Sequence, residues 1–324
     1  MQVSNRPIVS HDLLKLTLYV VAVLIGGALL SPWLVSGGQW LLTTFNPSQT
    51  EPPSGLLKEI HKADFSRYFS RATQICAVLL LFPLIRSTGL NRSLIPSWTP
   101  ARTGLTNYLL GFILAASLLL TLGWAFCQNT IYRLRPEPAW TALAAPLTAA
   151  LGAGILEEIF FRGAILGLLL RTLRPITALL FSSALFAFVH FLRPPETWSL
   201  PLNEVTWTSG FQALSAILAT FKNTDFLLAE FATLFAVGCV LAAARLRTGQ
   251  LWASMGLHGG WVFGLKYFSA LTLSSKALRA GDHLPWIGLN LKIGLAPLLV
   301  ITLTGLIVLR LLPRTQNSPE NVIK

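Results

Sequence analysis

Charged residues are scarce in this sequence. Lys, Arg, Asp and Glu together make up 12% of its 324 residues, whereas 53% of the residues are hydrophobic. An ordinary globular domain carries about 25% charged residues. A soluble protein of this length would need more polar surface than these residues can supply. The composition therefore excludes an ordinary soluble globular protein and indicates an integral membrane protein.

Cysteine is rarer still. The chain has three cysteines, Cys76, Cys127 and Cys239, and each lies inside an apolar run with no paired spacing. Buried single thiols usually act as small hydrophobic residues. The sequence therefore predicts neither disulfides nor a thiolate metal site.

Acidic residues are also few, 13 against 25 Lys and Arg, which gives a formal net charge of +12. No basic face with interleaved aromatic residues is present, as a nucleic-acid ligand would require. The Lys and Arg residues instead collect at the ends of apolar runs and in short loops, as anionic lipid head groups favour. We expect a lipid bilayer as partner and no nucleic acid. The basic residues divide almost evenly between the two sides, so they leave the orientation open.

Long uncharged apolar runs are what the sequence does contain. Each strong run is close to the roughly 20 residues that span the hydrocarbon core of a bilayer. The strong runs are 16–35, 104–132, 139–156, 175–192, 248–265 and 293–309, and the weaker ones are 72–85 and 226–244. The sequence predicts an all-α, polytopic membrane protein with about eight transmembrane helices in one bundle. We expect a multi-pass location in a bacterial inner (plasma) membrane.

Two stretches outside these runs have features of a membrane surface. Residues 56–68 alternate apolar and basic residues as an amphipathic helix does, and such a basic helix is expected to lie on the bilayer. Residues 196–225 form the longest irregular stretch of the second half, with Trp198 and Trp207 among them. We interpret this stretch as an interfacial or re-entrant cover whose tryptophans lie at head-group depth.

Ionisable residues interrupt the apolar runs at three places. Glu157, Glu158 and Arg162 break one run, and His190 and His258 lie in two others. Ionisable groups are costly to bury in a membrane and are therefore functional candidates. In a continuous helix, Glu158 and Arg162 lie one turn apart and can pair. Glu157 then points about 100° away around the axis, so it is not needed for this pair and can take a different role.

A carboxylate and two imidazoles at membrane depth suit the activation of water. A buried glutamate can act as a base near neutral pH. A histidine can orient water, relay its proton or bind a divalent metal, and a second histidine can donate to an oxyanion. Each group also has a plainer explanation: paired glutamates can mark a helix end, and a lone histidine can be part of the core. Glu230, likewise, either reaches the site or simply ends a helix. No His-Glu-x-x-His, Gly-x-Ser-x-Gly or Walker A motif is present.

These residues carry a resemblance to a known family. Glu157-Glu158-x-x-x-Arg162, Phe186-x-x-x-His190 and His258 are similar to the three motifs of the CPBP family of intramembrane proteases, which comprises type II CAAX prenyl endopeptidases and bacteriocin-processing (Abi) proteins. The similarity covers roughly residues 139–265. It implies an eight-helix membrane fold with the site inside the bundle, and an endopeptidase that cleaves a membrane-associated protein or peptide.

The resemblance also assigns roles to the residues. It implies Glu157 as the general base, His190 as the residue that positions water, and Glu158 as a supporting carboxylate paired to Arg162. His258 would stabilise the oxyanion or ligate a metal. Whether a divalent metal such as zinc takes part stays open; its ligands would be Glu157, His190 and His258.

One position departs from the family's pattern. The third motif usually has Asn four residues after its histidine, and here that position is Val262. Ser254 or the indole of Trp261 is expected to replace the missing amide. The departure also keeps open a catalytically silent relative that binds or regulates a membrane partner. A transporter that uses the same carboxylates is the other rival, although no symmetric pair of broken helices is found.

The resemblance suggests how the chain is organised. We expect an N-terminal transmembrane region with an interfacial helix over 1–135, a CAAX-protease-like catalytic core over 136–270, and a C-terminal transmembrane helix and tail over 271–324. These parts would form one structural domain.

Overall fold

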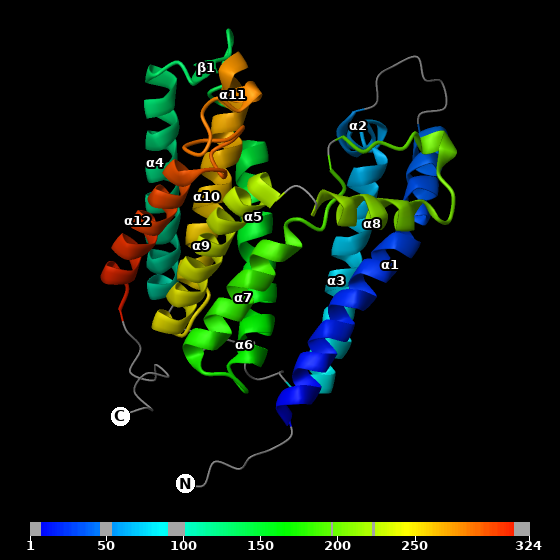
Figure 1. The fold of residues 1–324 in the computed structure, drawn as a ribbon, viewed down its shortest axis with the longest axis horizontal. Helices are drawn as coiled ribbons and strands as arrows, with labels where there is room; N and C mark the ends of the chain where they lie inside the picture. Colours follow the sequence, from blue (N-terminus) through cyan, green and yellow to red (C-terminus); the bar gives the residue numbers. More distant parts are fainter. Residues whose placement is uncertain (1–7, 46–53, 90–100, 196, 222–223, 314–324) are drawn as a thin grey trace. The chain divides into compact units, whose positions relative to one another are not determined.

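The computed structural model describes residues 8–45, 54–89, 101–195, 197–221 and 224–313. Within these ranges the protein is helical, with a single pair of short strands (Figure 1). Every apolar run that the sequence predicts to be a transmembrane helix coincides with a helix. Four of the helices are long and apolar enough to cross a membrane: His11–Phe45, Phe65–Thr88, Arg102–Gln128 and Glu230–Thr248. The chain is thus an all-α, multi-pass membrane protein.

The chain divides into two compact units where the sequence predicts one bundle. The first unit comprises Met1–Gly89 and His190–Thr224, and the second comprises Leu90–Val189 and Asp225–Lys324. The scheme that assigns residues 136–270 to a catalytic core stays a prediction, and the expected tail from residue 314 onward lies outside the described residues.

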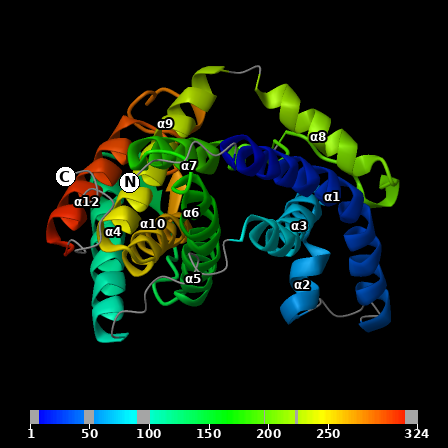
Figure 2. The same ribbon diagram turned by 90° about the horizontal axis from the view of Figure 1, so that it is seen from below.

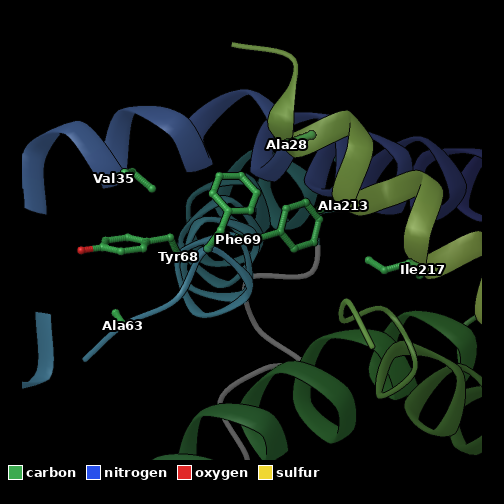
Figure 3. Packing of buried hydrophobic residues seen from close by; sticks show 8 residues of the cluster. Ala28, Val35, Ala63, Tyr68, Phe69, Ala213 and Ile217 are labelled. Atoms are coloured by element: carbon green, nitrogen blue, oxygen red, sulfur yellow. The ribbon is translucent and has the colours of Figure 1, made fainter. Parts of the chain in front are cut away.

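The first unit is built on two long helices that pack along each other. Its elements are α1 (Ile8–Phe45), α2 (Gly55–His61), α3 (Phe65–Thr88), a short 3₁₀ turn (Leu202–Glu204) and α8 (Ser209–Thr220). Small residues allow the helices to approach closely, because a Cβ at Gly210 of α8 would lie 1.9 Å from the carbonyl oxygen of Ala28 on α1. Figure 3 shows Phe69 and its neighbours between α1, α3 and α8, where they form the apolar core of this unit.

The expected amphipathic helix over 56–68 is divided in the structure. Helix α2 ends at His61, and α3 begins at Phe65. The cause is Asp64, whose carboxylate accepts a hydrogen bond from the backbone N–H of Arg67 at 2.9 Å and caps the start of α3. An N-cap residue has non-helical dihedral angles, so a helix cannot continue through it.

The expected cover over 196–225 is also different. Its described part contains a regular helix, α8, that packs against α1. Trp198 packs edge-on against Phe65 at a ring distance of 5.9 Å and is partly buried against the apolar core of the unit. Trp207 is 74% exposed, so its expected position at head-group depth stays a prediction. Residues 196, 222 and 223 lie outside the described residues.

The second unit is arranged around α10. Its elements are α4 (Ala101–Gln128), β1 (Tyr132–Leu134), α5 (Ala144–Glu158), the π-helix η1 (Ile159–Ile165), α6 (Leu166–Leu169), α7 (Pro175–Val189), α9 (Thr224–Thr248), α10 (Trp252–Leu271), β2 (Thr272–Ser274), α11 (Lys276–Ala280) and α12 (Leu295–Leu311). Helix α10 lies between α4 and α5, as Figure 2 shows. Strands β1 and β2 pair antiparallel, with Tyr132 opposite Ser274.

Glycines explain how α10 fits between its neighbours. A Cβ at Gly256 would lie 2.0 Å from the carbonyl oxygen of Tyr108 on α4, and a Cβ at Gly260 would lie 2.4 Å from that of Phe112. On the side that faces α5, Gly154 of α5 lies directly against the backbone of Gly259. Small residues permit such close approach of helix backbones in membrane proteins. The glycines around His258 therefore hold this histidine's helix against α4 and α5.

Candidate active site

The paired glutamates lie where one helix changes its geometry. Glu157 and Glu158 are the last residues of α5, and the chain continues directly into the π-helix η1, which contains Arg162. Short π-helical turns inside α-helices are rare and often occur at functional sites. The sequence predicts a continuous α-helix here, and it contains no signal for the π turn.

Glu158 and Arg162 form the ion pair that their spacing predicts. Arg162 Nη1 donates to Glu158 Oε1 at 3.0 Å, and both side chains are fully buried. A pair this deeply buried needs further hydrogen bonds to offset the cost of removing two charges from water.

Other elements of the unit supply these contacts to Arg162. Its Nη2 donates to the carbonyl oxygen of Gly238 on α9 at 3.3 Å. Its guanidinium carbon lies 4.3 Å from the ring centroid of Phe186 on α7, a cation–π arrangement. Arg162 therefore links η1, α7 and α9 around one carboxylate. Phe186, the first residue of the second motif, thus belongs to this cluster.

His258 on α10 completes the cluster. Its Nδ1 lies 2.9 Å from Glu158 Oε1, and its ring packs edge-on against Phe186 at 5.8 Å. The Glu158 carboxylate beside Arg162 is an acceptor, so we assign the Nδ1 proton to His258 as the donor. In the neutral imidazole, Nε2 then carries the lone pair.

The second ring nitrogen of His258, Nε2, faces the other glutamate. Glu157 Oε2 lies 3.9 Å from His258 Nε2. The side chain of Glu157 is 36% exposed, whereas that of Glu158 is 0% exposed. The 100° turn between adjacent helix positions therefore gives one carboxylate a fixed ion pair and leaves the other partly exposed, although its Oε2, which faces His258, is buried.

The remaining predicted residues lie as follows. His190 directly follows α7, is partly buried and belongs to the first unit. Ser254 is buried and donates to the carbonyl oxygen of Leu251 at 2.9 Å. Glu230 is buried in an ion pair with Lys292, a partner that the sequence analysis missed because it lies 62 residues away. Within the second unit, the structure thus brings together Glu157, Glu158, Arg162 and His258.

The distances in this cluster can be compared with those of a zinc site. Glu157 Oε2 and His258 Nε2 are close enough for two ligands of one zinc ion at about 2 Å each. A catalytic zinc site uses three protein ligands. Among the residues that the structure describes, no group of three or more His, Cys, Asp or Glu side chains could hold a metal ion. The three ligands that the resemblance implies include His190 of the first unit, so a metal site with these ligands stays a prediction, and no step below passes through a metal.

Comparison with family models places this cluster in a known context. Residues 138–264 match the model of the Rce1-like type II CAAX prenyl endopeptidases. These residues form an Rce1-like domain. Neither the curated proteins nor the solved structures gave a match.

The Rce1-like domain contains every residue of the cluster. It begins before α5 and ends within α10, so Glu157, Glu158, Arg162 and His258 all fall inside it, as do Phe186 and Gly238. The family is a protease family, and the buried Glu158–His258 pair is consistent with its active site. The resemblance predicted from the three sequence motifs is thereby confirmed.

Proposed function

We propose that this chain is an intramembrane endopeptidase that hydrolyses a peptide bond in a membrane-associated protein or peptide. One observation carries the proposal: the carboxylate of Glu157, a partly exposed glutamate, lies 3.9 Å from Nε2 of a histidine whose Nδ1 is hydrogen-bonded to a buried carboxylate. That geometry, inside an Rce1-like domain, supports acid–base chemistry on water.

The residues of the cluster have different roles in the proposed reaction. Glu157 acts as the base that removes a proton from water, and the water oxygen attacks the scissile carbonyl carbon. His258 Nε2, 3.9 Å from Glu157, accepts a hydrogen bond from the same water or from protonated Glu157. Glu158 and Arg162 position His258 and do not touch the reacting atoms. His190 lies in the first unit, and the water-positioning role that the family resemblance implies for it stays a prediction.

We propose that His258 works as a neutral imidazole, in a role other than the oxyanion donor that the resemblance implies. A neutral His258 that donates through Nδ1 has no proton on Nε2, so it cannot donate to an oxyanion. We therefore assign His258 to proton handling in place of oxyanion stabilisation.

The wider proposal concerns the membrane and the substrate. We propose about eight spans in a bacterial inner membrane, and a peptide substrate that reaches the site from the bilayer. The family's name, CAAX prenyl endopeptidase, suggests the first compound to test: an internally quenched peptide that ends in a farnesylated Cys-aliphatic-aliphatic-X sequence.

Glu157→Gln tests the proposal. The change keeps the shape of the side chain and removes the base, so the cleavage rate should fall by about two to four orders of magnitude. Purified protein in lipid nanodiscs is assayed with the quenched peptide and with a panel of membrane-anchored peptides. Glu137→Gln is the matched control, because Glu137 is an exposed glutamate of the same unit. Equal rates in the wild type and Glu157→Gln would refute the proposal.

A catalytically silent relative is the second candidate, and Val262 favours it. The family's usual amide is absent at that position, and a protein that only binds a partner would not need it. Such a protein would keep its cellular role in the double variant Glu157→Gln and His190→Ala. Complementation of a deletion strain by this variant would select the silent alternative.

A further inference from the structure

Trp261 has a buried hydrogen-bond donor that the fold leaves unused. The residue lies on α10 and is 6% exposed. Its indole Nε1 makes no hydrogen bond to any of the described residues. An unpaired N–H away from water costs free energy, and nearly all such groups in proteins find a partner. A donor left without a partner in a buried site is therefore expected to serve a ligand.

The position of Trp261 relates it to the missing amide. It follows His258 by three residues and directly precedes Val262, where the family usually has Asn. At about 100° per residue, Trp261 lies about 60° from His258 on one side of the helix, and Val262 lies about 40° away on the other. Both are one turn along α10 from the histidine. The long indole can therefore reach the space beside His258 that a short amide would reach from the next position.

Most other donors near His258 are already engaged. Ser254 donates to Leu251, and the two terminal nitrogens of Arg162 donate to Glu158 and to Gly238. Arg162 Nε has no partner among the described residues, but it belongs to a side chain that is 0% exposed and whose guanidinium is already paired to Glu158. His258 itself uses its Nδ1 proton on Glu158.

We propose that the indole N–H of Trp261 stabilises the oxyanion during peptide hydrolysis, in place of the family's amide. This inference rests on the proposed function. As the water oxygen bonds to the carbonyl carbon, its proton passes to Glu157, and the carbonyl π pair becomes an oxyanion. Trp261 donates a hydrogen bond to that oxygen and transfers no proton. The carbonyl then re-forms, the C–N bond breaks, and Glu157 returns the proton to the leaving amine.

Trp261→Phe tests the inference, because it removes the N–H and keeps an aromatic ring. Loss of one oxyanion donor should lower kcat by about 100-fold or more and leave KM nearly unchanged. Val262→Asn in the Trp261→Phe background should restore at least a tenth of the wild-type kcat, because it returns the family's amide. Ser269→Ala is the control on the same helix and should keep the wild-type kcat, because Ser269 is exposed and its hydroxyl bonds only the carbonyl oxygen of Leu265. The rates are measured in nanodiscs with the quenched prenylated peptide, and melting temperatures confirm that each variant is folded.

A second measurement does not depend on the variants' folding. In wild-type protein labelled with ¹⁵N-tryptophan, the Trp261 indole N–H resonance should shift downfield when a peptidyl phosphonate, a mimic of the tetrahedral oxyanion, is bound. An active wild type whose Trp261→Phe variant keeps its kcat, or whose Trp261 resonance does not move, overturns this inference alone. So does a loss in Trp261→Phe that Val262→Asn does not restore. A wild type that cleaves no peptide overturns the proposed function itself.

Discussion

Glu157 and Glu158 are neighbours in the chain, yet they meet different surroundings. Glu158 is fully buried between Arg162 and His258, whereas Glu157 keeps 36% of its side chain exposed. The separation follows from helix geometry, since adjacent residues project about 100° apart. A single turn of helix thus supplies both a fixed carboxylate and an accessible one, which two-carboxylate chemistry requires.

The Glu158–Arg162 pair should have a large effect on stability when only one partner is removed. Arg162→Met leaves Glu158 as a buried charge without its counter-ion, which typically costs about 3–5 kcal/mol. Glu158→Gln should cost a similar amount, because it leaves Arg162 uncompensated. The double variant should cost clearly less than the sum of the two single changes. Reversible unfolding in mixed micelles measures the free energies.

Arg67 provides the matched control for this pair. Its Nη1 lies 3.5 Å from Glu59, and the two side chains are 50% and 67% exposed. Arg67→Met should cost at most about 1 kcal/mol, since exposed ion pairs contribute little. If the losses in free energy of unfolding caused by Glu158→Gln and Arg162→Met simply added up in the double variant, the two side chains would not form the buried ion pair described above.

At this scale, the sequence predicts local contacts well and distant ones poorly. The Glu158–Arg162 pair follows from helical spacing alone. The bond from His258 to Glu158 joins residues 100 positions apart, so it depends on how α10 packs against α5. The resemblance placed both residues in one site but gave no sign of which imidazole nitrogen faces which carboxylate.

At the scale of elements, α10 is the helix on which the site depends. Close approach to α4 and α5 is possible only where α10 and its partners lack side chains. The glycines on either side of His258 thus explain both the helix packing and the position of the imidazole. Three glycines around one histidine suit either tight helix packing or a substrate groove, and the close contacts in the structure support packing.

Alanine substitutions of these glycines should separate tight positions from open ones. Gly256→Ala places a methyl group 2.0 Å from a backbone oxygen, so α4 and α10 must move apart. We expect a loss of at least about 1–3 kcal/mol, as for overpacked cores. Gly259→Ala, whose nearest atom is 3.3 Å away, should cost less. Thermal unfolding followed by circular dichroism measures the series.

Gly152 on α5 is the control for this series. A Cβ there meets nothing within 4 Å, and replacing a helical glycine by alanine removes conformational freedom from the unfolded chain. Gly152→Ala should therefore leave stability unchanged or raise it by about 0.5–1 kcal/mol. Equal melting temperatures for Gly256→Ala and Gly152→Ala would show that α4 and α10 do not approach as closely as described.

Element types were largely predictable, and element boundaries were not. Apolar runs identify helices because a bilayer requires each backbone group to be paired within its own segment. The N-cap at Asp64 and the π turn after Glu158 are local choices that hydrophobicity does not report. The β1–β2 pair joins segments far apart in sequence, and no pattern within either segment predicts this pairing.

At the scale of the whole molecule, the Rce1-like domain and the compact units divide the chain differently. The domain covers residues 138–264, and the part from His190 to Thr224 belongs to the first unit. Apolar runs show that helices exist but carry little information on which helices pack together. Pairing depends on small residues at particular turns, such as Gly27, where a Cβ would lie 2.5 Å from Thr73 Oγ1.

The second unit is long enough, measured along its helices, to cross a bilayer. Helix α10 has 20 residues, which span about 30 Å, the thickness of the hydrocarbon core. In Figure 1, α6 and α11 lie at opposite ends of this unit. Arg174, which follows α6, and Lys276, which begins α11, are both exposed and should therefore lie on opposite sides of the membrane.

Cysteine labelling tests this arrangement. Arg174→Cys and Lys276→Cys are made separately after the native cysteines are replaced by serine, and a membrane-impermeant maleimide is applied to right-side-out and inside-out vesicles. Each variant should react in one kind of vesicle, and the two should react in different kinds. Arg133→Cys is the control: β1 pairs with β2 close to Lys276, so this variant should react with Lys276→Cys. Labelling of Arg174→Cys and Lys276→Cys from the same side would show that the second unit does not span the bilayer, and the active site would then need a different place relative to the lipid.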